Sequence, residues 1–133
     1  MRISLQFAFA FIAFAIISCS SCQSIQTDTY NAVVSEKEFD KIIGGDKLVM
    51  VDFYTTWCGP CKKMAPFVQQ IKTNRNKEVI VLQVDAESQF GISDRYRLEG
   101  YPTLIFFKRG QVIGRALGYQ NYDALSSLVD RFK

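Results

Sequence analysis

One stretch of this chain restricts its fold more than any other. It is an almost continuous apolar run at residues 47–55, KLVMVDFYT, followed closely by WCGPC at 57–61. A short apolar run of this kind is typical of a parallel strand that is covered on both faces of a sheet. Beyond it, four apolar residues recur at helical spacing: Met64, Phe67, Val68 and Ile71. The stretch therefore predicts a buried central strand, a short turn and a helix that begins at or near Cys58.

Strand and helix patterns alternate along the rest of the chain. A short strand at 33–34 is expected to lead into a helix that Ser35 and Glu38 cap and that the glycines at 44–45 end. Further strands are expected at 78–85, 103–108 and 111–118, and further helices at 88–96 and 121–132. A tight turn makes the last two strands an antiparallel hairpin. Residues 32–133 are thus predicted to form one α/β domain, with a mixed central sheet flanked by helices on both faces.

The composition excludes several classes of function. The chain contains no His, so the usual general base and the commonest metal ligand are both missing. Any acid or base must be a carboxylate, Cys, Tyr or Lys. The formal net charge is only +3 and the basic residues are scattered, which gives no indication of a nucleic-acid partner.

The first eighteen residues have the pattern of a signal peptide. The apolar segment from Leu5 to Ile17 would reach about 20 Å as a helix, against about 30 Å of hydrocarbon in a bilayer, so a stable membrane span is disfavoured. It ends in Ile-Ile-Ser-Cys, which resembles the lipobox of bacterial lipoproteins, so Cys19 is predicted to become the lipidated first residue. The alternative is an ordinary signal peptide with Cys19 unmodified. Both alternatives place the domain outside the cytoplasm, on the periplasmic side.

Residues 19–31 are mostly polar and are predicted to form a flexible tether between the anchor and the domain. Cys19 and Cys22 could in principle join Cys58 and Cys61 in a four-cysteine zinc site. The thirty-five residues between the two pairs exceed the usual spacing, so no metal site is expected and Cys22 remains unassigned.

Two cysteines separated by two residues at the start of a helix lie about one turn apart, close enough for a disulfide. Backbone N–H groups and the helix dipole favour a thiolate on Cys58, which is therefore predicted to be the nucleophile. Cys61 would then resolve the mixed disulfide. This redox-active pair requires no cofactor.

Asp52 interrupts the apolar run where a strand should be buried. Burial raises the pKa of a carboxyl group, which would allow Asp52 to exchange a proton near neutral pH as a general base for Cys61. The alternative is a residue at a strand end that reaches solvent or caps a neighbouring element.

The order and spacing of these residues from Ala32 to Lys133 closely resemble the thioredoxin family. WCGPC resembles its active-site motif, and four more positions match: Asp52 its buried aspartate, Pro66 its helix-kinking proline, Tyr101-Pro102-Thr103 its cis-proline loop, and Gly118 its glycine beside the substrate groove. The resemblance implies a thioredoxin fold, thiol–disulfide oxidoreductase activity and a cis bond before Pro102. It also implies a set of substrate-binding residues: Trp57, Gly59, Pro60, Tyr101, Pro102 and Gly118.

Two positions depart from the pattern. Val81 stands where many thioredoxins carry a lysine near the aspartate, which leaves open how the Asp52 charge is balanced. Tyr101 replaces the usual Ile, and GYPT is similar instead to protein disulfide isomerase domains.

Gly59 and Pro60 place no cation between the cysteines, which favours a reductase or disulfide-exchange role over an oxidant. We expect a monomer that acts on protein disulfides, is held at the membrane by its lipid and receives electrons from a membrane partner. A disulfide oxidase or isomerase is the first alternative, and a tethered non-enzymatic binding module is the second.

Overall fold

The structure is a computed structural model and describes residues 34–133. Along the chain these residues form α1 (Glu36–Ile43), β1 (Leu48–Tyr54), α2 (Gly59–Asn74), β2 (Val79–Asp85), α3 (Phe90–Asp94), β3 (Thr103–Lys108), β4 (Gln111–Leu117) and α4 (Tyr122–Phe132). The predicted signal peptide at 1–18, Cys19 and the predicted tether at 19–31 lie outside the described residues. Within residues 34–133, no helix is both long and apolar enough to cross a membrane.

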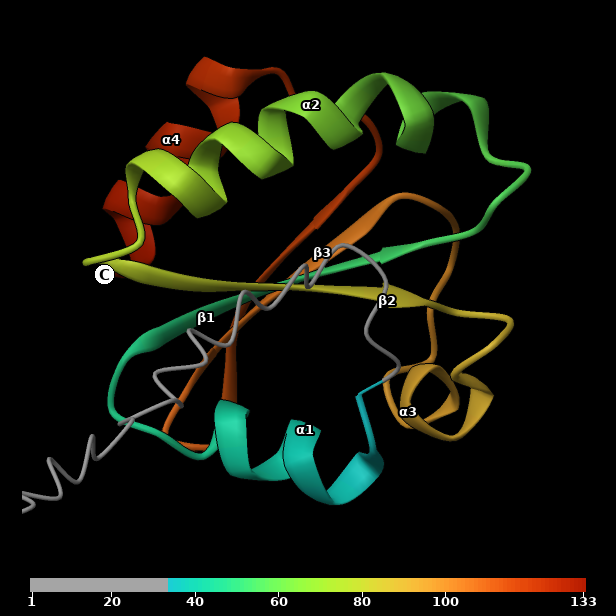
Figure 1. Cartoon of the computed structure of the whole chain (residues 1–133), viewed down its shortest axis with the longest axis horizontal. Helices are drawn as coiled ribbons and strands as arrows, with labels where there is room; N and C mark the ends of the chain where they lie inside the picture. Colours follow the sequence, from blue (N-terminus) through green and yellow to red (C-terminus); the bar gives the residue numbers. More distant parts are fainter. Residues whose placement is uncertain (1–33) are drawn as a thin grey trace, which may run out of the picture.

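The strands form one sheet in the order β2-β1-β3-β4 (Figure 1). β1 is parallel to β2 and antiparallel to β3, and β3 and β4 form an antiparallel hairpin. The hairpin turn places Arg109 and Gly110 at positive φ, 53° and 76°, as a two-residue turn that follows the twist of its strands requires. The predicted mixed sheet with a central, partly parallel strand is confirmed.

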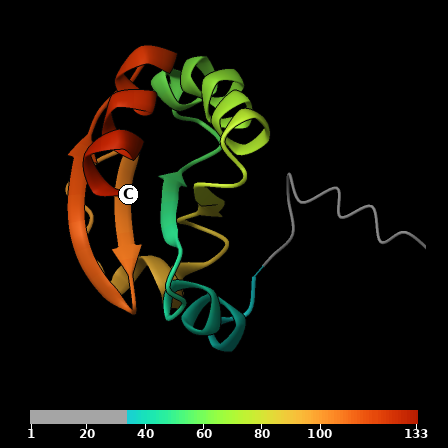
Figure 2. The same ribbon diagram turned by 90° about the vertical axis from the view of Figure 1, so that its left-hand side faces the viewer.

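Helices cover both faces of the sheet, with α2 and α4 on one side and α1 and α3 on the other (Figure 2). β1 is buried on both faces, and its side chains alternate between the two layers of core. Leu48 and Met50 pack toward α2 and α4, whereas Val49, Val51 and Phe53 pack toward α1 and α3. Asp52 follows Met50 by two residues, so this alternation points its side chain toward the α2 layer.

The helix ends follow the capping signals of the sequence. Ser35 Oγ accepts a hydrogen bond from Glu38 N at 3.2 Å at the start of α1, and Gly44 is its C-cap. Asn121 Oδ1 accepts from Ala124 N at 2.9 Å at the start of α4. Both helices thus begin at N-caps that were predicted from the sequence, and α1 also ends at the predicted glycine.

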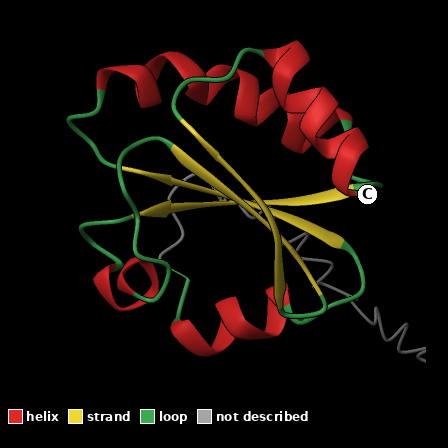
Figure 3. Cartoon of the chain, turned by 180° about the vertical axis from the view of Figure 1, so that it is seen from behind, coloured by secondary structure: helices red, strands yellow, loops and turns green. Residues whose placement is uncertain are grey.

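Two sequence predictions need correction. Val33 of the predicted first strand lies outside the described residues, and Val34 is not in a strand, because its carbonyl accepts a hydrogen bond from the side chain of Gln89. The helix predicted at 88–96 is only α3, since Ser93 Oγ bonds to two local carbonyls and Arg97 has a positive φ of 47°. Figure 3 shows α3 beside α1, on the face of the sheet opposite α2 and α4.

Candidate active site

The two cysteines lie where β1 passes through a short turn into α2. Cys58 is the N-cap of α2 and Cys61 lies in its first turn, and the two form a disulfide with a Cα–Cα distance of 5.3 Å. Cys58 Sγ accepts a hydrogen bond from Cys61 N at 3.2 Å. The side chain of Cys58 thus takes the place of a capping oxygen, where a backbone N–H and the helix dipole favour a thiolate.

Exposure does not distinguish the two sulfurs, because Cys58 is 4% and Cys61 6% exposed. The assignment of nucleophile and resolving cysteine therefore depends on their positions in the helix. Gly59 and Pro60, which separate them, are both exposed and bring no charge.

Asp52 lies in the middle of the sheet and is only 2% exposed. The alternative of a strand-end residue that reaches solvent is therefore wrong. Burial raises the pKa of Asp52 from 3.8 to about 7, and a hydrogen bond from Gln83 acts in the opposite direction. Gln83 Nε2 donates this bond to Asp52 Oδ2 at 3.2 Å.

Gln83 was not identified from the sequence. Val81 lies in the apolar core and pairs with Met50, whereas Gln83 is the β2 residue in register with Asp52. The available signal was a single amide inside the otherwise apolar strand VIVLQVD. The neutral amide of Gln83 therefore contacts the aspartate in a sheet where Val81 supplies no cation.

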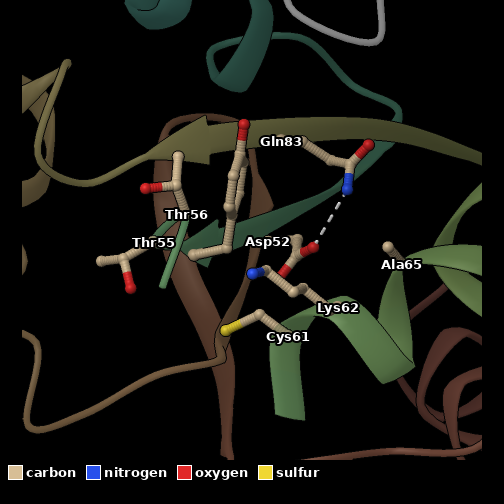
Figure 4. Close-up of a pocket in the computed structure, with 8 residues that line it drawn as sticks. Asp52, Thr55, Thr56, Cys61, Lys62, Ala65 and Gln83 are labelled. Carbon is tan, nitrogen blue, oxygen red and sulfur yellow. Dashed lines mark hydrogen bonds between the residues drawn. The ribbon is translucent and has the colours of Figure 1, made fainter. Parts of the chain in front are cut away.

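A cavity of about 220 Å³ is lined by both Asp52 and Cys61 (Figure 4). It is lined by Asp52 and Tyr54 of β1, Thr55 and Thr56 of the turn, Cys61, Lys62 and Ala65 of α2, and Gln83 of β2. Asp52 and the resolving cysteine thus line the same cavity, so the sequence prediction that the aspartate lies beneath the dithiol agrees with the structure.

The loop before β3 meets the turn that carries Trp57. The Tyr101–Pro102 peptide bond is cis, as the resemblance implied. The ring of Tyr101 packs edge-on against Trp57, with centroids 6.1 Å apart. Gly118, at a φ of 88°, donates its N–H to Pro102 O at 2.8 Å. Trp57 and Gly118 thus each contact the loop of Tyr101 and Pro102.

The surface around this loop is apolar beyond what the sequence analysis identified. Trp57 is 66% exposed and Leu117 56%, and Tyr119 packs edge-on against Phe67 of α2. Trp57 Nε1 also donates to Glu87 Oε1 at 3.0 Å. Leu117 and Tyr119 flank the predicted Gly118, and that adjacency was the signal available for them.

Within residues 34–133, no three potential metal-ligating side chains lie together. Cys19 and Cys22, which the zinc alternative required, lie outside this range.

Comparison with known proteins agrees with this geometry. The thioredoxin family profile matches residues 30–131. Thioredoxin 1 of Plasmodium falciparum is 35% identical over 100 residues, which cover 75% of this chain and 94% of that protein. A thioredoxin of Echinococcus granulosus is 40% identical over 90 residues, which cover 65% of this chain and 83% of that protein.

Solved structures give the same result. The thioredoxin of Malassezia sympodialis superposes with a TM-score of 0.70 at 34% identity, over 75% of this chain and 87% of that one. The thioredoxin of Plasmodium falciparum gives a TM-score of 0.69 at 33% identity, over 76% and 97%. The chain therefore belongs to the thioredoxin family, and it is a protein-disulfide oxidoreductase whose redox centre is the Cys58–Cys61 pair.

Proposed function

We propose that this protein reduces or exchanges disulfides of proteins outside the cytoplasm. The observation that carries the proposal is the dithiol at the start of α2, where Cys58 accepts a backbone N–H and the intervening Gly59 and Pro60 bring no cation. A cation at that place would stabilise the thiolate further and make the reduced form a weaker reductant. Its absence favours the transfer of electrons from the dithiol to the client.

The reaction has two exchange steps. The Cys58 thiolate attacks one sulfur of a client disulfide, the bond between the client sulfurs breaks, and the other client sulfur leaves as a thiolate. Cys61 then loses its proton and attacks Cys58 sulfur, which releases the second client thiolate. The client gains two electrons and the protein is left with the Cys58–Cys61 disulfide.

Asp52 is proposed as the general base of the second step. It shares the cavity with Cys61, and its pKa of about 7 suits proton transfer at neutral pH. The thiol proton would pass to the Asp52 carboxylate, directly or through a water.

The client would bind across Trp57, Tyr101 and Gly118, beside the dithiol. The exposed ring of Trp57 and the edge-on contact with Tyr101 offer an apolar surface, and the backbone before Pro102 would pair with an extended client segment. Gly59 and Pro60 would lie under the same segment.

The location follows from the sequence pattern at residues 1–18 and is part of the proposal. A lipid on Cys19 and the polar tether at 19–31 would hold a monomeric domain at the periplasmic face of a membrane. A membrane-bound dithiol donor would return the two electrons after each cycle.

The equilibrium reduction potential of the Cys58/Cys61 pair, measured against glutathione, tests this function. We expect a value closer to about −270 mV, the known potential of thioredoxin, than to about −180 mV, that of protein disulfide isomerase. A potential at or above the latter value would assign the protein to disulfide oxidation or isomerisation instead. A cellular phenotype that survives Cys58→Ser would indicate a binding module.

A further inference from the structure

Three buried polar atoms around the cavity under the dithiol have no hydrogen-bond partner among residues 34–133: Asp52 Oδ1, Thr55 Oγ1 and Gln83 Oε1. Buried polar atoms are rarely left unpaired in folded proteins. All three residues line the cavity of about 220 Å³ that also contains Cys61. Unpaired polar atoms beside a cavity of this size are candidate partners for ordered water.

Gln83 lines this cavity and contacts Asp52 directly. Its Nε2 donates to Asp52 Oδ2, and its Oε1 is one of the unpaired atoms. Both groups belong to one planar amide, so the bond to Asp52 also fixes where Oε1 lies. Register supports the arrangement, because Gln83 is the β2 partner of Asp52.

The charged and titratable groups that line the cavity do not hold the Asp52 carboxyl in place. β1 contributes the Tyr54 phenol, and α2 contributes the Cys61 thiol and the Lys62 ammonium. On β3, the residue that pairs with Asp52 is the apolar Leu104. The side-chain hydrogen bond that reaches Asp52 is donated by Gln83, and Lys62 makes no such contact.

We infer that Gln83 is a positioning residue of the resolving step. Its NH₂ group donates to Asp52 Oδ2 and holds the carboxyl in place, so that the unpaired Oδ1 is left to accept the Cys61 proton. The inference rests on the proposed general-base role of Asp52. In the step, the Cys61 proton passes to Asp52, directly or through a water, Cys61 sulfur bonds to Cys58 sulfur, and the client sulfur leaves with the electron pair. Gln83 neither gains nor loses a proton.

Gln83→Met tests the inference, because Met has a similar length and no donor. A hydrogen bond to a carboxylate stabilises its ionised form. The titration midpoint of the Asp52 carboxyl should therefore rise by about one pH unit when the hydrogen bond from Gln83 is lost. The midpoint can be read from the ¹³C shift of the Asp52 carboxyl in the oxidised full chain. Gln83→Lys, which supplies a cation at the same place, should lower the midpoint.

Kinetics give the second measurement. With a fluorescent peptide disulfide in stopped flow, the plateau rate at saturating peptide reports resolution, and the second-order rate reports attack by Cys58. Gln83→Met should lower the plateau about fivefold at pH 7, because a one-unit rise leaves about a tenth of Asp52 ionised in place of half. The second-order rate should stay as in the parent.

Gln89→Met is the matched control. Gln89 is buried where Gln83 is half-buried, and its Nε2 donates to Val34 O at 2.9 Å, away from the dithiol. It should lose stability but keep the Asp52 midpoint and the plateau rate.

The outcomes separate this inference from the proposed function. If Asp52→Asn lowers the plateau rate but Gln83→Met leaves the midpoint and the plateau unchanged, Gln83 has no positioning role and the general base stands. If Asp52→Asn leaves the plateau rate and its pH dependence unchanged, both roles are wrong. Equal midpoint shifts in Gln83→Met and Gln89→Met would also overturn the inference, since they would indicate a general loosening of the fold.

Discussion

At the scale of single residues, the chemistry of the site depends on one buried carboxyl, because Asp52 is only 2% exposed and burial raises its pKa to about 7. Asp52 was predictable because a carboxyl inside a nearly continuous apolar strand is costly and needs a reason. Gln83 was missed because one polar residue in a strand is ordinary, and only the parallel register with Asp52 gives it a meaning. Leu117 and Tyr119 were missed for a similar reason, since an exposed apolar side chain acquires a role only from its neighbours in the fold.

Asp52→Asn should make the protein more stable at neutral pH. The folded-state pKa of Asp52 is raised from 3.8 to about 7, so the folded state holds its proton more tightly than the unfolded chain. Asp52 therefore lowers the free energy of unfolding of the parent protein in a pH-dependent way. This loss is absent well below pH 3.8, grows as the pH rises toward about 7, and stays constant above. The free energy of unfolding of the variant should exceed that of the parent by about 4 kcal/mol at pH 7.

Urea unfolding of the oxidised protein between pH 3 and pH 8 measures this difference. The two curves should converge in acid. A difference that is independent of pH would mean that the Asp52 carboxyl does not titrate in this range.

The two thiols should behave asymmetrically when each is replaced. Cys61→Ser leaves the Cys58 nucleophile without its resolving partner, so mixed disulfides with clients should accumulate. Cys58→Ser should trap few clients and lose insulin reduction. Non-reducing gels after acid quenching compare the two variants, and equal trapping would show that the roles had been assigned wrongly.

At the scale of elements, the helix ends and the β1–α2 junction were predictable because local chemistry determines them. Ser35 and Asn121 accept the backbone N–H groups that start α1 and α4, and Cys58 does the same for α2. The length of α3 was not predictable, because it depends on Ser93 bonding to Ala86 and Phe90 carbonyls. The hydrophobic periodicity of the sequence also gave no indication that α4 packs against the β3–β4 hairpin.

That packing gives a prediction for β4. A Cβ atom at Gly114 would overlap the ring of Phe132, which stacks on Phe106 with centroids 4.7 Å apart. Gly114→Ala should therefore destabilise the protein by about 1–3 kcal/mol, the usual cost of overpacking. Thermal unfolding measures the loss.

Two further variants test the cause. In a Phe132→Leu background the added cost of Gly114→Ala should shrink, because the smaller side chain leaves room. Gly59→Ala serves as the control, since its Cβ would have no neighbour within 4 Å. An unchanged cost in the Phe132→Leu background would show that ring overlap is not the cause.

At the scale of the whole molecule, the fold places its chemistry at one end of the sheet. β1 delivers Asp52 and then the dithiol, while the loops before β3 and after β4 bring Pro102 and Gly118 together. The opposite end of α2 is joined to α4 by Arg75, which pairs with Glu78 and Asp130. Hydrogen bonds from Arg75, and then from Lys133, lower the pKa of both carboxyls to about 2. The sequence predicted this architecture because most elements had a clear hydrophobic periodicity and were bounded by capping or turn residues.

The position of the molecule in the cell is predicted from residues 1–19 alone. Processing at Cys19 would attach a diacylglyceryl group, and two acyl chains are enough for stable anchoring where one is marginal. Cys19→Ala should therefore release the protein from the membrane fraction of a bacterial host, or block its maturation, and abolish labelling by palmitate. Cys22→Ala is the matched control, because it removes a thiol three residues away and should leave both fractionation and labelling as in the parent. If the Cys19→Ala variant behaves like the parent in both fractionation and labelling, the lipoprotein prediction is wrong. The protein then has an ordinary signal peptide, and residues 19–31 do not connect the domain to a lipid.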